Sequence, residues 1–234
     1  MINVFYFEKK DQLCYYLINK RYNLTMVKLV TKKASSEARQ RAHKIINDVH
    51  KKLKKEYVFF CRPIGSQTRR CIVPDKNGKY DLDYQIILTK KSKGEMKPTS
   101  IKKKFLEAFT FARNKNEKVE DSTTVITVRC SKDANKFNAK TEKFSFDFVI
   151  LDVNENYRIK RKTSNEYTWC ELPTRHTELY KKYNKMNYIQ QKNFLEEYLL
   201  PNVIKEKQKN ESERKATIEI FYEQINNYLQ NGKK

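Results

Sequence analysis

The amino-acid sequence predicts an α+β fold, in which a mixed or antiparallel sheet and one long helix form a core and a smaller helical lobe follows. Three observations lead to this fold class. Apolar residues recur at helical spacing over residues 36–55, polar and apolar residues alternate as in strands over Tyr80–Thr89 and Lys143–Val153, and the patterns from Pro173 onward are helical. With 234 residues, the chain is long enough for one large domain or two small lobes.

The long helix follows two serines that can cap its first turn. Ser35 and Ser36 precede Glu37. The apolar stripe of the helix then consists of Ala38, Ala42, Ile45, Ile46, Val49 and Leu53. Residues three and four apart share one side of a helix, so the pattern predicts an amphipathic helix.

The other elements of the core are shorter. A strand at Tyr57–Cys61 is expected to end at Pro63 and Gly65, and a turn at Asp75–Gly78 precedes the strand that starts at Tyr80. The remaining expected elements are a helix capped by Ser100 with the stripe Ile101, Phe105, Phe109 and Ala112, a strand at Thr123–Cys130, and a hairpin loop at 132–143.

The C-terminal part is predicted to be a helical lobe. Its expected helices are Thr174–Lys185, Tyr188–Glu206 with a break at Pro201, and Ser212–Gln230. The composition changes near Trp169, which we expect to anchor the core rather than to stack on a base. We therefore divide the chain into a core at residues 1–168 and a helical lobe at residues 169–234.

The chain is strongly basic, with a formal net charge of +22 at pH 7. Such a charge fits a polyanionic partner, namely nucleic acid, nucleoside triphosphates or an acidic surface. Lysine greatly outnumbers arginine, the residue that bidentate phosphate recognition favours, so the charge supports nucleic-acid binding only weakly. It would still concentrate triphosphates near a cleft.

The compartment is predicted from the cysteines and from hydropathy. The five cysteines are widely spaced and form no CxxC pair, which predicts reduced, structural thiols in a cytoplasmic protein. No window approaches about 20 consecutive apolar residues, so we expect no membrane partner. The N-terminal residues become charged too early for a secretory signal.

Three aspartates interrupt strands that otherwise read as core. Asp81 and Asp83 share one face of their strand, and Asp147 breaks the apolar run FSFDFVIL. Burying such charges without compensation costs several kcal/mol each, and a divalent cation resolves the conflict. Two Mg²⁺ ions, or Mn²⁺ in their place, would suit nucleotidyl transfer. Gly65 and Ser66 precede the aspartates, where a backbone free of a side chain can approach a phosphate.

The stretch GSQTRRCIVPDKNGKYDLDYQIIL at residues 65–88 resembles the signature of the polymerase-β-type nucleotidyltransferase superfamily. Within that superfamily the chain is most similar to the CD-NTases, the bacterial relatives of cyclic GMP-AMP synthase. SSEARQRAHKIINDVHKKL resembles their long spine helix, FSFDFVIL their third-acid strand, and YTWCELPTRH the segment that leads into their helical lobe. The resemblance covers roughly residues 24–185 and implies a polymerase-β-like core with a reduced helical lobe.

The resemblance also implies residue roles and a function. Asp81 and Asp83 would bind both metal ions, and Asp147 would bind one and help to deprotonate the attacking ribose hydroxyl. The nucleotide-binding set would be Gly65, Ser66, Gln67, Arg70 and Lys181. The implied activity joins nucleoside triphosphates into a cyclic or linear oligonucleotide messenger in anti-phage defence, with a nucleic-acid or protein activator as a further partner.

Two other functions stay open at this point. The chain could transfer a nucleotide to RNA or to a protein hydroxyl, as small members of the superfamily do. Alternatively, it could be a catalytically idle domain that binds nucleotides or nucleic acid through its basic surface. The intact set of three acids argues against the idle domain.

Overall fold

The computed structural model describes residues 29–68, 72–172, 174–209, 213, 215 and 217–231. The described residues divide into two units, one that starts at Leu29 and a second that starts at Thr174. The boundary predicted at 168/169 falls inside the last strand of the first unit, Tyr167–Glu171. Residues 1–28 and the predicted helix start at Ser212 lie outside the described residues.

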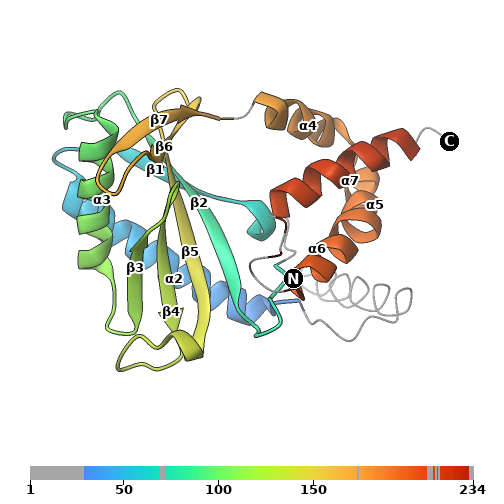
Figure 1. The fold of residues 1–234 in the computed structure, drawn as a ribbon, viewed down its shortest axis with the longest axis horizontal. Helices are drawn as coiled ribbons and strands as arrows, with labels where there is room; N and C mark the ends of the chain where they lie inside the picture. Colours follow the sequence, from blue (N-terminus) through green and yellow to red (C-terminus); the bar gives the residue numbers. More distant parts are fainter. Residues whose placement is uncertain are drawn as a thin grey trace, which may run out of the picture. The chain divides into compact units, whose positions relative to one another are not determined.

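The first unit is built on a mixed sheet of seven described strands (Figure 1). They are β1 (Phe59–Ile64), β2 (Tyr80–Leu88), β3 (Glu117–Asp121), β4 (Val125–Ser131), β5 (Glu142–Leu151), β6 (Tyr157–Arg161) and β7 (Tyr167–Glu171). The main order is β1-β2-β5-β4-β3, and β6 joins β5 to β7. Strand β5 runs parallel to β2 and antiparallel to β4, so the predicted mixed sheet is confirmed.

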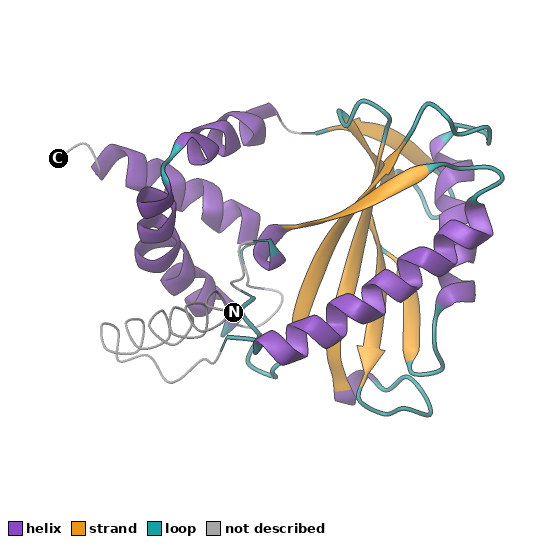
Figure 2. Cartoon of the chain, turned by 180° about the vertical axis from the view of Figure 1, so that it is seen from behind, coloured by secondary structure: helices purple, strands orange, loops and turns teal. Residues whose placement is uncertain are grey.

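Two helices pack on one face of this sheet, α2 (Lys32–Leu53) and α3 (Pro98–Ala112). Figure 2 shows α2 lying across the strands. The long helix was predicted, but its start was misplaced. The residue that caps it is Thr31, whose side chain accepts the Ala34 N–H, so Ser35 lies inside the helix. Helix α3 likewise begins before Ser100, at Pro98, whose missing N–H costs nothing in the first turn.

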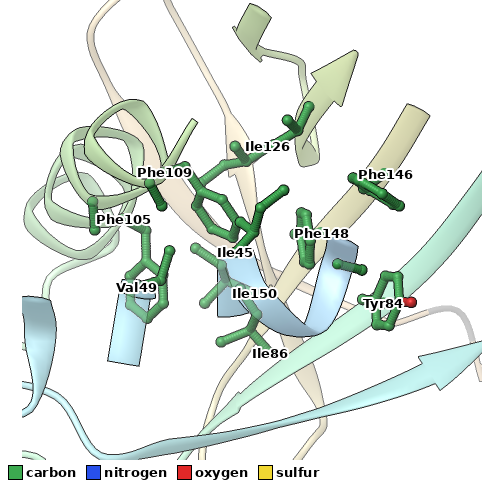
Figure 3. Close-up of a cluster of buried hydrophobic side chains, with 14 of the residues drawn as sticks. Ile45, Val49, Tyr84, Ile86, Phe105, Phe109, Ile126, Phe146, Phe148 and Ile150 are labelled. Atoms are coloured by element: carbon green, nitrogen blue, oxygen red, sulfur yellow. The ribbon is translucent and has the colours of Figure 1, made fainter. Parts of the chain in front are cut away.

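The core lies between these helices and the sheet (Figure 3). Phe148 is fully buried and its ring centroid is 4.5 Å from that of Phe109 on α3. Tyr84 is also buried and stacks on Phe148 at 5.3 Å. Burial raises the pKa of Tyr84 to about 12, so its hydroxyl stays protonated. We call this side of the sheet the helix-covered face.

The strand predictions need three corrections. Strand β1 spans Phe59–Ile64 instead of Tyr57–Cys61, so it runs through Pro63 and ends immediately before Gly65. Proline is tolerated there because β1 pairs with β2 alone among the described strands and is an edge strand. Strand β3 was missed because its sequence, EKVED, carries four charges. Strands β6 and β7 were missed because polar residues fill their exposed positions.

The second unit is helical. Its described helices are α4 (Thr174–Lys185), α5 (Tyr188–Asn193), the π-helix η3 (Phe194–Leu199), α6 (Leu200–Lys207) and α7 (Thr217–Asn231). The predicted break at Pro201 was wrong, because the backbone stays helical from Tyr188 through Lys207. The π-turns immediately before Pro201 accommodate its missing N–H. Phe194 and Phe221 are fully buried and meet edge to face at 5.5 Å.

The described cysteines Cys61, Cys130 and Cys170 are free thiols. Burial raises the pKa of Cys61 to about 12, which makes it a poor nucleophile. Cys14 and Cys71 lie outside the described residues. In the described part of the chain, no helix has the length and hydrophobicity that a membrane span requires.

Candidate active site

The candidate site lies on the face of the sheet opposite the helices. Along β2, Tyr80, Leu82 and Tyr84 are buried in the core, and Asp81 and Asp83 alternate with them. Along β5, Phe146 and Phe148 are buried and flank Asp147 in the same way. Because strand side chains alternate in direction, all three aspartates emerge on one side, which we call the polar face.

The register of the parallel pair brings two of the acids together. Asp83 lies directly opposite Asp147, and Asp81 lies opposite Ser145, one repeat along the same face. Like charges directly opposite each other on adjacent strands destabilise a sheet. The register therefore places Asp83 and Asp147 side by side on adjacent strands, and their use as metal ligands stays a prediction.

Hydroxyl groups on the same face bind two of the carboxylates. Ser145, which is almost fully buried, donates to Asp81 Oδ1 at 2.6 Å. Thr127 is the β4 residue opposite Asp147, and its hydroxyl donates to Asp147 Oδ1 at 2.7 Å. Asp81 itself is exposed, whereas Asp147 is half-buried. Asp147, on the central strand β5, is therefore more enclosed than Asp81 near the start of β2.

A short loop places Gly65 against the acids. The chain leaves β1 through the 3₁₀ turn Gly65–Gln67, and Gly65 has φ +70°, a conformation that favours glycine. A Cβ at this position would stand 2.8 Å from Asp83 Oδ2. No other residue can bring the backbone this close to the carboxylate without a shift.

Gln67 braces the same loop rather than pointing outward. Its side chain is buried, and Nε2 donates to the backbone oxygen of Asp83 at 2.5 Å. The Thr68 hydroxyl also donates to the Gly65 oxygen at 2.8 Å, which closes the turn on itself. These contacts fix the Gly-Ser turn to the strand that carries the acids.

A second set of charges borders the site. Arg129 lies opposite Ser145 and pairs with Glu120 at 2.7 Å and with Glu142 at 3.0 Å. Lys79 reaches the same Glu142 at 3.3 Å. Because Arg129 bridges acids from β3 and β5, it ties these strands together beside the aspartates.

The donor set suits a hard divalent cation, because Asp81, Asp83 and Asp147 offer carboxylate oxygens on one face of the sheet. The closely approached Gly65 leaves room that a side chain would fill. In the conformation described, however, no three His, Cys, Asp or Glu side chains of the described residues are gathered as a metal site. The three carboxylates therefore match a metal ion in donor type and in the face they share, but they do not form a metal-binding group in this structure.

The other predicted nucleotide-binding residues are spread over the chain. Ser66 is half-buried inside the 3₁₀ turn, next to Gly65. Arg70 lies outside the described residues. Lys181 is exposed on α4, in the second unit, so its place relative to the aspartates stays a prediction. Trp169, expected as a core anchor, packs against the core from β7.

Two site residues were not predicted from the sequence. Ser145 could have been found, because it stands two residues before Asp147 and must share its face. Thr127 could not, because a threonine in the run VITVRC is what any strand would carry, and only the β4–β5 register places it beside Asp147.

Comparisons with known proteins identify the fold. No family model and no curated protein matches the chain. Among solved structures, GTP-bound DncV of Vibrio cholerae superposes with a TM-score of 0.53 at 14% identity, covering 94% of this chain and 58% of that one. DncV of Escherichia coli with 3′-deoxy GTP gives 0.51 at 10% identity, covering 95% and 60%. The chain therefore has a CD-NTase-like fold and spans about three fifths of the length of these proteins.

Proposed function

We propose that the protein is a metal-dependent nucleotidyltransferase that joins nucleoside triphosphates into a cyclic or linear oligonucleotide. The observation that carries the proposal is the register of β2 and β5, which sets Asp83 opposite Asp147 beside the Gly65 loop. The fold supports it, because two of the structures that superpose are of DncV with GTP or 3′-deoxy GTP bound, and a third, with GTP bound, is described as a di-nucleotide cyclase.

Each residue has a distinct part in this proposal. Asp81 and Asp83 would hold both divalent ions, and Asp147 would hold one and accept the proton of the attacking ribose hydroxyl. When bound, Mg²⁺ or Mn²⁺ supplies charge stabilisation at the α-phosphate and at the leaving group. The hydroxyl oxygen bonds to the α-phosphorus. The bond between the α-phosphorus and the oxygen that bridges to the β-phosphate breaks, and pyrophosphate leaves with that oxygen. Gly65 and Ser66 would lie against the triphosphate.

The biological setting is part of the same proposal and rests on the sequence resemblance. It comprises a messenger role in anti-phage defence, a cytoplasmic location, and activation by a nucleic acid or a protein. The high positive charge supports nucleoside triphosphates as substrates, since it concentrates polyanions around the chain.

Product analysis tests the proposal. The purified protein is incubated with α-labelled nucleoside triphosphates and Mg²⁺ or Mn²⁺, treated with phosphatase, and its products are resolved by chromatography and mass spectrometry. We expect a phosphatase-resistant cyclic product, or a linear oligonucleotide identified by its mass. Either should be lost in Asp81→Asn/Asp83→Asn and kept in the control Asp48→Asn, on α2.

Three results would contradict the proposal. Label found only on added RNA or protein would identify transfer to a macromolecule. Product formation by the double variant would show that Asp81 and Asp83 are not needed for the reaction. Salt-sensitive binding of nucleic acid without turnover, unchanged in the double variant, would identify an idle binding domain.

A further inference from the structure

We propose that Thr127 is a positioning residue for the catalytic carboxylate of Asp147, and that Ser122 orients the Thr127 hydroxyl. The inference deepens the proposed function and rests on it. It concerns a chain of three side chains, Ser122, Thr127 and Asp147, that links the β3–β4 turn to the centre of the sheet.

The Thr127 side chain has little freedom to do anything else. It is 5% exposed, it lies opposite Asp147 across the β4–β5 pair, and its hydroxyl is 2.7 Å from Asp147 Oδ1. The β-branched side chain restricts the χ1 angle of threonine, so the direction of the hydroxyl is set by the strand. A buried hydroxyl at this distance holds the carboxylate in one orientation.

The direction of the hydrogen bonds follows from the chemistry of the groups. An ionised carboxylate only accepts hydrogen bonds, so the single hydroxyl hydrogen of Thr127 goes to Asp147. The Ser122 hydroxyl lies 3.2 Å from Thr127 Oγ1, and it must then be the donor to that oxygen. Ser122 is fixed in turn, because its backbone N–H donates to the oxygen of Val125 at 3.1 Å.

This arrangement bears on the reaction through Asp147. A carboxylate that has to hold a cation and accept a substrate proton must keep its oxygens in place while the charge around it changes. The hydroxyl supplies a neutral, directional contact that does not compete with the cation for charge. Loss of such an outer contact typically costs about 10–100-fold in metal affinity or activity.

The experiment compares Thr127→Val, which keeps the shape and removes the hydroxyl, with Thr127→Ser, which keeps the hydroxyl. Thr141→Val is the matched control, because Thr141 forms a hydroxyl pair with Ser131 at 2.7 Å in the same β4–β5 hairpin. For each variant, Mn²⁺ affinity is measured by electron paramagnetic resonance with a nonhydrolysable triphosphate present. The kcat and KM of product formation and the unfolding temperature are measured alongside.

We expect Thr127→Val to lower Mn²⁺ affinity and kcat by about 10–100-fold, with little change in the KM for the triphosphate. Thr127→Ser should restore most of both, and Thr141→Val should match the wild type. Ser122→Ala provides a second route if Thr127→Val folds poorly, and it should give a smaller loss in the same direction.

The outcomes separate this inference from the proposed function. If Asp147→Asn weakens Mn²⁺ binding and Thr127→Val and Ser122→Ala do not, the positioning role is wrong and the metal site stands. If the wild type binds no Mn²⁺, or if Asp147→Asn binds it as the wild type does, the proposed function fails first. Equal losses in Thr127→Val and Thr127→Ser would show a packing effect and would also overturn the inference.

Discussion

The two faces of the sheet differ in the groups that contact their acidic side chains. On the helix-covered face, Glu117 is buried and Arg41 neutralises it through two hydrogen bonds, each 2.6 Å long. On the polar face, Asp83 and Asp147 stand opposite each other, and the Asp147 contact described above comes from a neutral hydroxyl. The first arrangement serves stability, because an acid in the core is paired. The second brings like charges together, which is typical of a site for a cation.

The largest expected effect separates activity from stability at the polar face. Asp147→Asn should lower product formation by at least about 1,000-fold, because it removes a metal ligand and a proton acceptor. The free energy of unfolding should change by less than about 1 kcal/mol, since the amide oxygen can still accept the Thr127 hydrogen bond. Product assays and urea unfolding measure the two quantities. A variant that loses both together would show that Asp147 is needed mainly for folding.

The next residue along β5 should behave in the opposite way. Phe148→Ala empties a fully buried position against Phe109 and Tyr84, and should lower the free energy of unfolding by about 3–5 kcal/mol. Urea or thermal unfolding followed by circular dichroism measures this loss. The control is Phe111→Ala, a 69%-exposed phenylalanine of α3, which should cost less than about 0.5 kcal/mol. Similar costs for the two variants would mean that Phe148 does not lie in the core.

A smaller effect is expected at the glycine beside the acids. Gly65→Ala places a Cβ 2.8 Å from Asp83 Oδ2 at a positive φ, and should cost about 1–3 kcal/mol of stability and lower activity. Gly78→Ala is the matched control, because Gly78 also has a positive φ of +76° but a Cβ there meets nothing within 4 Å. Chemical denaturation and product assays should show an activity loss at Gly65 alone. Equal activity losses in both variants would mean that backbone strain at positive φ, and not the contact with Asp83, lowers the activity.

The smallest effect concerns pH and the helix-covered face. His50 of α2 stacks on Phe59 at 3.8 Å, and burial lowers its pKa below the ordinary value of 6.5. The unfolded chain then binds a proton more readily as the pH falls through 6.5, so His50 lowers stability in that range. His50→Asn should flatten the fall in unfolding temperature between about pH 7.5 and 5.5. A fall in His50→Asn that is as steep as in the wild type would contradict this role of His50.

The sequence predicted the elements that carry strong periodicity. The stripe of α2 and the alternation of β2 and β5 were found because burial on one face imposes a period on the residue types. The candidate acids were found by the same rule, since an aspartate within such a pattern stands out. The starts of α2 and α3 were misplaced because Thr31 and Pro98 compete with equally good capping residues nearby.

What the sequence could not provide was the pairing between distant segments. The register of β2 and β5 decides that Asp83, and not Asp81, lies opposite Asp147. A shift of two residues would exchange them, and no local preference encodes the register of strands some 60 residues apart. Strand β3 was not predicted for a related reason. Its acids form ion pairs with Arg41 and Arg129 from other segments, and the local sequence does not show these pairs. Thr127 likewise gains its role only from the strand beside it.

The most direct test of the account is a thermal unfolding experiment on the wild type and Asp83→Asn/Asp147→Asn, with and without Mn²⁺ and a nonhydrolysable nucleoside triphosphate. A ligand that binds only the folded state raises the unfolding temperature. We predict a clear rise for the wild type and for Asp48→Asn, and none for the double variant, which should itself unfold at nearly the wild-type temperature without ligand. An equal rise in the double variant, or no rise in the wild type, would contradict the claim that the polar face holds a metal–nucleotide complex.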